Sequence, residues 1–198
     1  MNSAKQSPRR LIIGISGASG IIYGIEILRA LKTQDVETHL VMSKSAILTL
    51  GHECELKYAD LCALADFHYT NSDIGAAISS GSFQSMGMVI APCSIRSLSE
   101  IATGVTSSLL SRAADVVLKE RRRLVLMVRE TPLHAGHLQT MLNVTNMGAV
   151  VFPPVPAFYS RPASLDEVVI QSVGRVLDLF GLDTGLVKRW GENPDTSA

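Results

Sequence analysis

Five short apolar runs recur along the chain, and longer segments with helical periodicity separate them. The runs have the length of buried parallel strands and show little apolar–polar alternation; they are Leu11–Ile15, Thr38–Met42, Met86–Ala91, Leu124–Val128 and Ala149–Phe152. Helical periodicity covers Ile22–Lys32, Ser45–Leu50, Leu98–Glu120 with a break near Gly104, and Leu138–Met147. This alternation predicts an α/β fold in which helices cover both faces of one parallel sheet.

A last helix is expected after the fifth run. It begins at a capping box formed by Ser164 and Glu167, and its apolar stripe is Leu165, Val168, Val169, Ser172, Val176 and Phe180. The chain has 198 residues, which suits one domain with a substantial core. We therefore predict a single domain over residues 9–190, with loose tails at 1–8 and 191–198.

The composition excludes several classes of protein. Formal net charge is zero, so the strong positive field of a nucleic-acid-binding protein is missing. Cys54, Cys62 and Cys93 cannot all pair and lack the spacing of a metal knuckle, which favours a reducing compartment. The apolar run after Arg9–Arg10 is too short for a signal-peptide core, and no run is long enough to span a membrane. We expect a cytoplasmic protein, and its 46% hydrophobic content suggests burial between subunits.

A glycine- and serine-rich loop, Gly14–Gly20, connects the first strand to the first helix. Glycines permit a tight turn, exposed N–H groups at a helix start attract phosphate, and Ser16 and Ser19 add donors. A dinucleotide fingerprint needs Gly-x-Gly and an acidic residue after the second strand, where this chain has Ser43–Lys44. The loop therefore favours a mononucleotide such as FMN, and the alternative is a simple tight turn.

The loops after the later strands carry further candidates. In the segment Pro92–Ser97, the hydroxyls of Ser94 and Ser97 can donate to a cofactor. Cys93 lies at the end of a strand, where a cysteine is typically a small buried residue. Arg129–Pro132 places Glu130 where an acid/base residue is useful. His134 and His137 lack the other ligands of a zinc site, so no metal is predicted.

Two basic side chains, Arg112 and Lys119, lie seven residues apart on one predicted helix face. They could belong to an exposed face with an Asp115–Lys119 pair, or they could clamp an anion together. The spacing alone favours the exposed face.

These loops, taken together and in order, resemble the UbiX-type flavin prenyltransferases, whose relatives have been called 3-octaprenyl-4-hydroxybenzoate or phenylacrylic acid decarboxylases. The resemblance extends from about Arg10 to Trp190. The matching segments are Gly14–Gly20, Met42–Lys44, Ser79–Ser82, Pro92–Ser94, Arg112–Val116, Leu118–Arg121, Arg129–Pro132 and Pro156–Tyr159.

The resemblance implies a flavodoxin-like three-layer fold and a homododecamer with FMN near subunit interfaces. It also implies a metal-independent reaction, in which a dimethylallyl group passes from dimethylallyl phosphate to N5 of reduced FMN and a ring closes at C6. The prenylated FMN would then pass to a UbiD-type decarboxylase in ubiquinone synthesis or aromatic acid breakdown.

The family's functional residues transfer to this sequence position by position. Those expected to contact FMN are Gly17, Ala18, Ser19, Ser43, Ser94, Ile95, Arg96, Ser97 and Arg129. Lys119, Tyr159 and Arg175 would hold the donor phosphate with Arg112 nearby, and this favours the clamp over the exposed face. Glu130 would be the acid/base, Ser19 would lie near the reacting ring, and Glu53 would reach a neighbouring subunit's site. Ile74 departs from the aromatic residue of some members, which leaves the shape of the prenyl pocket open.

Three other functions are alternatives to prenyl transfer. A flavin-dependent cysteine decarboxylase of the same fold would need a histidine base, and no loop here offers one. A non-catalytic flavin carrier would not need Glu130. Direct decarboxylation of aromatic acids would need an electron sink besides the flavin.

Overall fold

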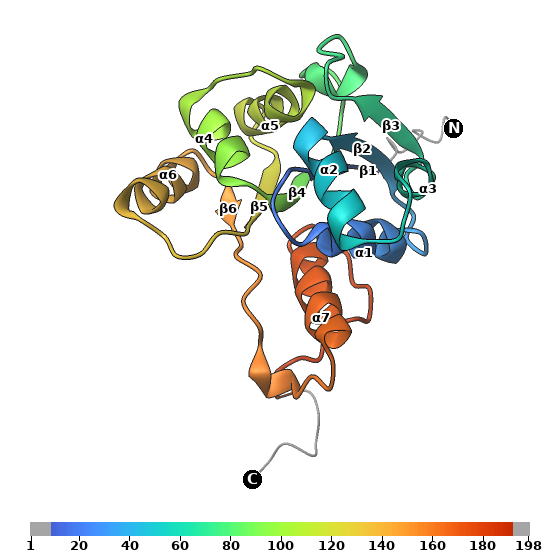
Figure 1. Ribbon diagram of the computed structural model, residues 1–198. Coiled ribbons are helices and arrows are strands. Elements are labelled where there is room, and N and C mark those ends of the chain that lie inside the picture. Colours follow the sequence, from blue (N-terminus) through green and yellow to red (C-terminus); the bar gives the residue numbers. More distant parts are fainter. Residues whose placement is uncertain (1–8, 192–198) are drawn as a thin grey trace, which may run out of the picture.

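One parallel sheet forms the centre of the molecule, as the alternation of strands and helices predicted. In the computed structural model, residues 9–191 are described, and the sheet has six strands in the order β3-β2-β1-β4-β5-β6 (Figure 1). The strands are β1 (Arg10–Ile15), β2 (Glu37–Met42), β3 (Phe67–Thr70), β4 (Gly87–Cys93), β5 (Arg123–Val128) and β6 (Val150–Val151). The predicted tails lie, except for Gly191, outside the described residues.

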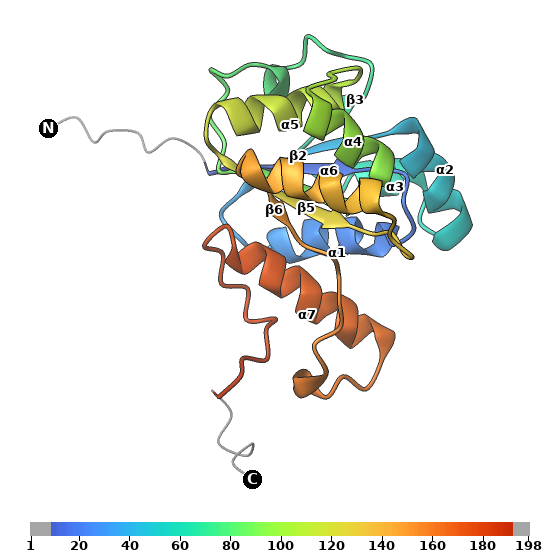
Figure 2. The same ribbon diagram turned by 90° about the vertical axis from the view of Figure 1, so that its left-hand side faces the viewer.

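The helices divide into two groups, one for each face of the sheet. The first group is α1 (Ile21–Leu31), α2 (Lys44–Glu53), α3 (Tyr58–Cys62) and α7 (Leu165–Asp178); the second is α4 (Ile95–Thr103), α5 (Leu109–Lys119) and α6 (Ala135–Asn146). On β1, Ile13 and Ile15 pack with the first group, and Ile12 packs with the second. Figure 2 shows α1 and α7 below the sheet and α4 and α5 above it. The three-layer α/β/α architecture is thereby confirmed.

The strand order creates a topological switch between β1 and β4. β1 pairs with β2 on one side and with β4 on the other, so Ile13 lies opposite both Leu40 and Val89. The chain leaves β1 for a helix on one face and leaves β4 for a helix on the opposite face. In doubly wound sheets a crevice for ligands opens at the carboxyl ends of the strands at this point.

Two elements were not predicted. β3, with the sequence Phe-His-Tyr-Thr, is a mostly exposed edge strand without an apolar run, and α3 has only five residues. The predicted break in the long helix is confirmed, because Gly104 ends α4 in the left-handed region at φ 69°. The predicted capping box is half formed. Ser164 Oγ accepts the Glu167 N–H, but the Glu167 carboxylate accepts from Ala163 instead of Ser164.

Residues 152–164, here called the C-terminal arm, connect β6 to α7. The arm runs away from the sheet to the 3-10 helix η2 (Phe158–Ser160) before α7 turns back (Figure 1). Large apolar side chains on and beside the arm are exposed, among them Val155, Phe158, Leu165 and Trp190. Within residues 9–191, none of the helices combines the length and the apolar character needed to cross a membrane.

Candidate functional site

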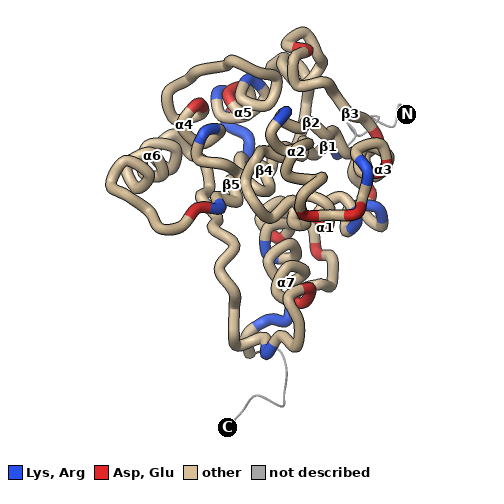
Figure 3. The backbone as a smooth tube through the Cα atoms, viewed as in Figure 1, with Lys and Arg blue, Asp and Glu red and all other residues tan. Residues whose placement is uncertain are grey.

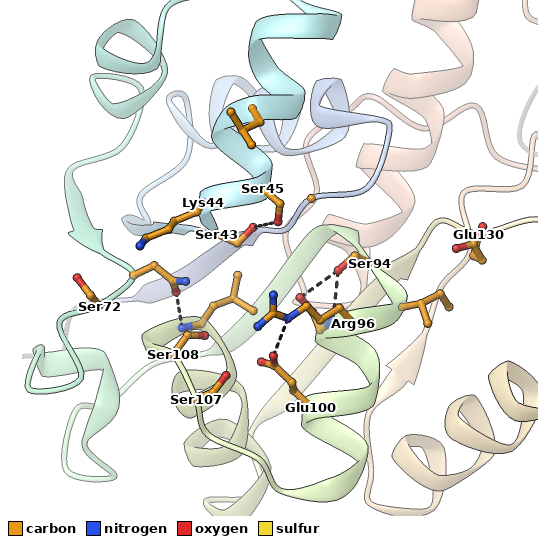
Figure 4. A pocket seen from close by; sticks show the side chains of 16 residues that line it. Ser43, Lys44, Ser45, Ser72, Ser94, Arg96, Glu100, Ser107, Ser108 and Glu130 are labelled. Atoms are coloured by element: carbon orange, nitrogen blue, oxygen red, sulfur yellow. Dashed lines mark hydrogen bonds and ion pairs between the residues drawn. The ribbon is translucent and has the colours of Figure 1, made fainter.

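A cavity of about 810 Å³ lies at the carboxyl ends of the central strands (Figure 4). Its volume is in the range of pockets that bind small molecules and cofactors. Segments far apart in sequence line it: Gly17, Ser43, Lys44, Ser45, Leu48, Asn71, Ser72, Ser94, Ile95, Arg96, Ser97, Glu100, Ser107, Ser108, Leu110 and Glu130. Seven of the predicted site residues are therefore brought together, namely Gly17, Ser43, Ser94, Ile95, Arg96, Ser97 and Glu130.

The loop after β1 is held tightly against its neighbours. A Cβ on Gly17 would lie 2.3 Å from the Ser45 side chain, so only glycine allows this approach to α2. Ser16 is fully buried, where its hydroxyl donates to the Pro92 carbonyl (2.9 Å) and accepts the Ser94 N–H (2.7 Å). Ser16 therefore joins the loops after β1 and β4, and the expectation that it is a free donor for a ligand was wrong.

The first turn of α1 is closed by an acidic side chain of this chain. Glu53 Oε2 accepts the N–H groups of Gly20 (2.9 Å) and Ile21 (3.0 Å). Burial raises the pKa of Glu53, but hydrogen bonds from Ser19, Gly20 and Ile21 and the charge of Arg129 outweigh burial and lower that pKa. The carboxylate is thus anionic at a helix start. The expectation that these N–H groups are exposed to attract phosphate was wrong.

The first turn of α5 is closed as well. The backbone carbonyl of Asn71 accepts the Leu109 N–H (2.8 Å), and its side-chain oxygen accepts the Leu110 N–H (3.0 Å). Ser108 and Ser111 complete a reciprocal capping box. Each of the first three backbone N–H groups of α5 therefore has an acceptor within the chain.

The starts of α2 and α4 are open by contrast. The Ser43 hydroxyl caps α2 by accepting the Ala46 N–H, and the Ser94 hydroxyl caps α4 by accepting the Ser97 N–H. The first two N–H groups of each helix have no acceptor within residues 9–191, and both helix starts border the cavity. Within the described residues Lys44 makes no ion pair, whereas Arg96 pairs with Glu100 (3.0 Å). Two open helix starts and an uncompensated lysine favour an anionic group.

The loop after β5 brings an acidic and a basic residue to the same region. Glu130 lines the cavity and accepts the Thr131 N–H (3.0 Å), and the Arg129 N–H donates to the Cys93 carbonyl (3.1 Å). Cys93 is fully buried, and burial raises its pKa to about 12. Cys93 is therefore a packing residue, as predicted, because only a thiolate is nucleophilic.

The residues assigned to the donor phosphate lie outside the cavity of their own chain. Lys119 is the last residue of α5, about 15 Å along the helix from the end that lines the cavity. Tyr159 lies on the C-terminal arm against Trp190, and Arg175 pairs with Asp178 (2.8 Å).

Arg112, also on α5, pairs with Asp115 (2.9 Å), while Lys119 pairs with Glu120 (2.6 Å). The Asp115–Lys119 pair considered from the sequence is therefore not formed. Figure 3 shows the basic and acidic positions interspersed over the molecule, in keeping with zero net charge.

Sequence reasoning missed several lining residues, among them Asn71–Ser72 and Ser107–Ser108. The second pair could have been found, since Ser108 follows the break at Gly104 and precedes an apolar helical pattern. Asn71 gave no signal because the strand before it was not recognised. Within the described part of the chain, no cluster of histidine, cysteine and carboxylate side chains could hold a metal ion.

Comparisons with known proteins identify the relatives of this chain. A family model described as Flavoprotein matches residues 1–177. The flavin prenyltransferase UbiX of Escherichia coli K12 is 58% identical over 92% of this chain and 98% of its own length. The crystal structure of AnUbiX (PadA1) in complex with FMN and dimethylallyl pyrophosphate has a TM-score of 0.91 and 52% identity, and covers 92% and 97% of the two chains. A dodecameric FMN-dependent UbiX-like decarboxylase from Escherichia coli O157:H7 has a TM-score of 0.89 and 48% identity, with coverage of 91% and 98%.

Proposed function

The chain belongs to the flavoprotein family and to its UbiX-type flavin prenyltransferases, and from that premise we propose what its site does. The reaction is transfer of a dimethylallyl group from dimethylallyl phosphate to reduced FMN, giving prenylated FMN. The observation that carries this proposal is the cavity between the open starts of α2 and α4, which fits a phosphorylated ligand of the size of FMN.

FMN, when bound, supplies the nucleophilic ring atoms N5 and C6. We assign its binding to Gly17, Ala18, Ser19, Ser43, Ser94, Ile95, Arg96, Ser97 and Arg129. Gly17 and the two serine caps support this assignment because they line the cavity. Ser19 and Arg129 support it differently: both interact with Glu53 at the start of α1, beside the loop that carries Gly17.

The donor phosphate needs positive charge as the C–O bond of dimethylallyl phosphate breaks and inorganic phosphate leaves. Fixed cationic and hydroxyl groups stabilise such developing negative charge without a metal. We assign this role to Lys119, Tyr159 and Arg175, with Arg112 nearby. Because these residues lie outside the cavity of their own chain, we propose that neighbouring copies in a homododecamer bring them to it, and the dodecameric relative supports this.

Glu130 is assigned the proton transfers. Its carboxyl group can give a proton to the departing phosphate oxygen and can accept the proton that the flavin loses when the ring closes at C6. Glu53 would act at a site completed by a neighbouring copy.

The cysteine decarboxylase alternative is not favoured, because no histidine is among the residues that line the cavity. A carrier without catalytic activity would bind FMN and leave it unchanged. We further propose that the product passes to a UbiD-type decarboxylase and that the protein acts in the cytoplasm.

The decisive experiment is anaerobic incubation with reduced FMN and dimethylallyl phosphate, followed by mass spectrometry of the extracted flavin. We expect a flavin heavier by one five-carbon unit, together with released inorganic phosphate. Recovery of unmodified FMN alone would disprove prenyl transfer and favour the carrier.

A further inference from the structure

Asn71 lies at the end of β3 and reaches from the edge of the sheet to the start of α5. It is half-buried and lines the cavity together with Ser72. Both its backbone and its side-chain carbonyl oxygen accept hydrogen bonds from α5, as described above.

These bonds determine which way the amide of Asn71 points. An asparagine side chain has one acceptor oxygen and one NH₂ group with two donors. The oxygen accepts the Leu110 N–H at 3.0 Å, so a flip of the amide would replace that bond with two donors facing each other. The NH₂ group is therefore held on the other side, and within residues 9–191 no group accepts a hydrogen bond from it.

Asn71 lines the cavity and directly precedes Ser72, which lies at the end of the cavity that also has Lys44. Figure 4 shows Lys44, Ser72 and Ser108 at one end and Glu130 at the other. The cationic end has the open start of α2 and the unpaired Lys44, and it is the natural place for the phosphate of a bound flavin mononucleotide. The end with Glu130 is left for the flavin ring.

We propose that Asn71 is a specificity-determining residue: its side-chain NH₂ donates to the phosphate of FMN, so that the site selects FMN over riboflavin. The proposal rests on the proposed function, since it requires FMN in this cavity. α5 has a positioning role, because the Leu110 N–H orients the amide toward the ligand.

The test compares the dissociation constants of FMN and riboflavin, measured by quenching of flavin fluorescence, in the wild type and in Asn71→Asp. An aspartate still accepts the Leu110 N–H and suits a helix start, so the melting temperature should be kept. It loses the donors and places a negative charge beside the phosphate. We expect FMN to bind at least about tenfold more weakly and riboflavin to change less than about threefold.

Ser111→Ala is the matched control. Ser111 is buried, does not line the cavity, and belongs to the same helix start through its bond to Ser108. It should lower the melting temperature and leave the ratio of the two dissociation constants unchanged.

The proposal is overturned if Asn71→Asp weakens the binding of FMN and of riboflavin by the same factor, or weakens neither. It is also overturned if Ser111→Ala shifts the ratio of the two dissociation constants as much as Asn71→Asp does. A wild type that binds no FMN would contradict the proposed function itself. A wild type that binds FMN, together with an unchanged ratio in Asn71→Asp, would contradict this inference alone.

Discussion

The cavity and the residues assigned to the donor phosphate differ in what holds them in place. Around the cavity, bonds within one chain decide the geometry: Ser16 joins two loops, Glu53 closes α1, and Asn71 closes α5. Tyr159 lies instead on an exposed arm, and Lys119 lies at the far end of α5. This difference supports the proposal that one chain builds the flavin-binding half of the site and that a neighbouring chain supplies the half that binds the donor phosphate.

The largest effect is expected from Glu130→Gln, which changes the half built by one chain. The amide keeps the size of the side chain but cannot exchange a proton, so prenyl transfer should fall by about 10²–10⁴-fold. FMN binding should be preserved, because Glu130 is not among the residues that we assign to FMN. Rates of prenylated FMN formation and FMN dissociation constants would check this, and equal turnover in variant and wild type would contradict the role of Glu130.

Lys119→Ala tests whether residues of two chains together form one site. Loss of this cation should slow transfer by about 10²-fold, as for removal of one charge-stabilising group from other active sites. Assemblies that contain both Lys119→Ala and Glu130→Gln chains, formed by coexpression, should regain part of the activity, since some sites then combine a normal Glu130 with a normal Lys119.

A simple mixture of the two separately assembled variants is the control for that experiment. If both residues acted from the same chain, no coexpressed assembly would contain an intact site. Activity at the level of the single variants would therefore place Lys119 and Glu130 in one chain.

Glu53→Gln tests the part of the site that is held by bonds within one chain. The amide can still accept one N–H but loses the negative charge at the start of α1, so we expect the free energy of unfolding to fall by about 1 kcal/mol. Denaturant titration at neutral pH measures the change. Glu55→Gln, an exposed neighbour, is the control and should have little effect.

The smallest effect concerns pH and the buried side chain of His39. His39 is 2% exposed, between Glu37 (2.9 Å) and Tyr69 (2.9 Å). Burial lowers its pKa below the usual value, although the hydrogen bond and charge of Glu37 oppose this. The unfolded chain then binds more protons than the folded one as pH falls below about 6.5, so stability should decrease there.

Melting temperatures between pH 7.5 and 5.5 would check this, with His39→Gln as the comparison because glutamine keeps hydrogen-bonding groups and does not titrate. The wild type should lose more stability than the variant over this range. Parallel curves would show that His39 does not contribute to the acid sensitivity.

Much of the architecture could be predicted from sequence because it rests on local patterns. Apolar runs the length of strands, helical periodicity and the break at Gly104 predicted the three layers. β3 was not predicted because this exposed edge strand has no apolar run. The strand nevertheless places Asn71 beside the cavity. The polar loops after the strands were recognised as the site because carboxyl ends of parallel strands share one edge of a sheet.

The layer order of the fold therefore follows from the amino-acid sequence, as do the sheet edge of the candidate site and the residue types available there. Which donors remain free for a ligand depends on how the chain folds. The reason is that hydrogen bonds are satisfied over long distances in sequence: Gly20 and Glu53 are 33 residues apart, Asn71 and Leu110 are 39 apart, and Ser16 and Ser94 are 78 apart. The sequence of the glycine-rich loop is typical of a phosphate-binding turn. In the folded chain, however, Glu53 accepts the N–H groups at the start of α1, and the starts of α2 and α4 are the ones that stay open.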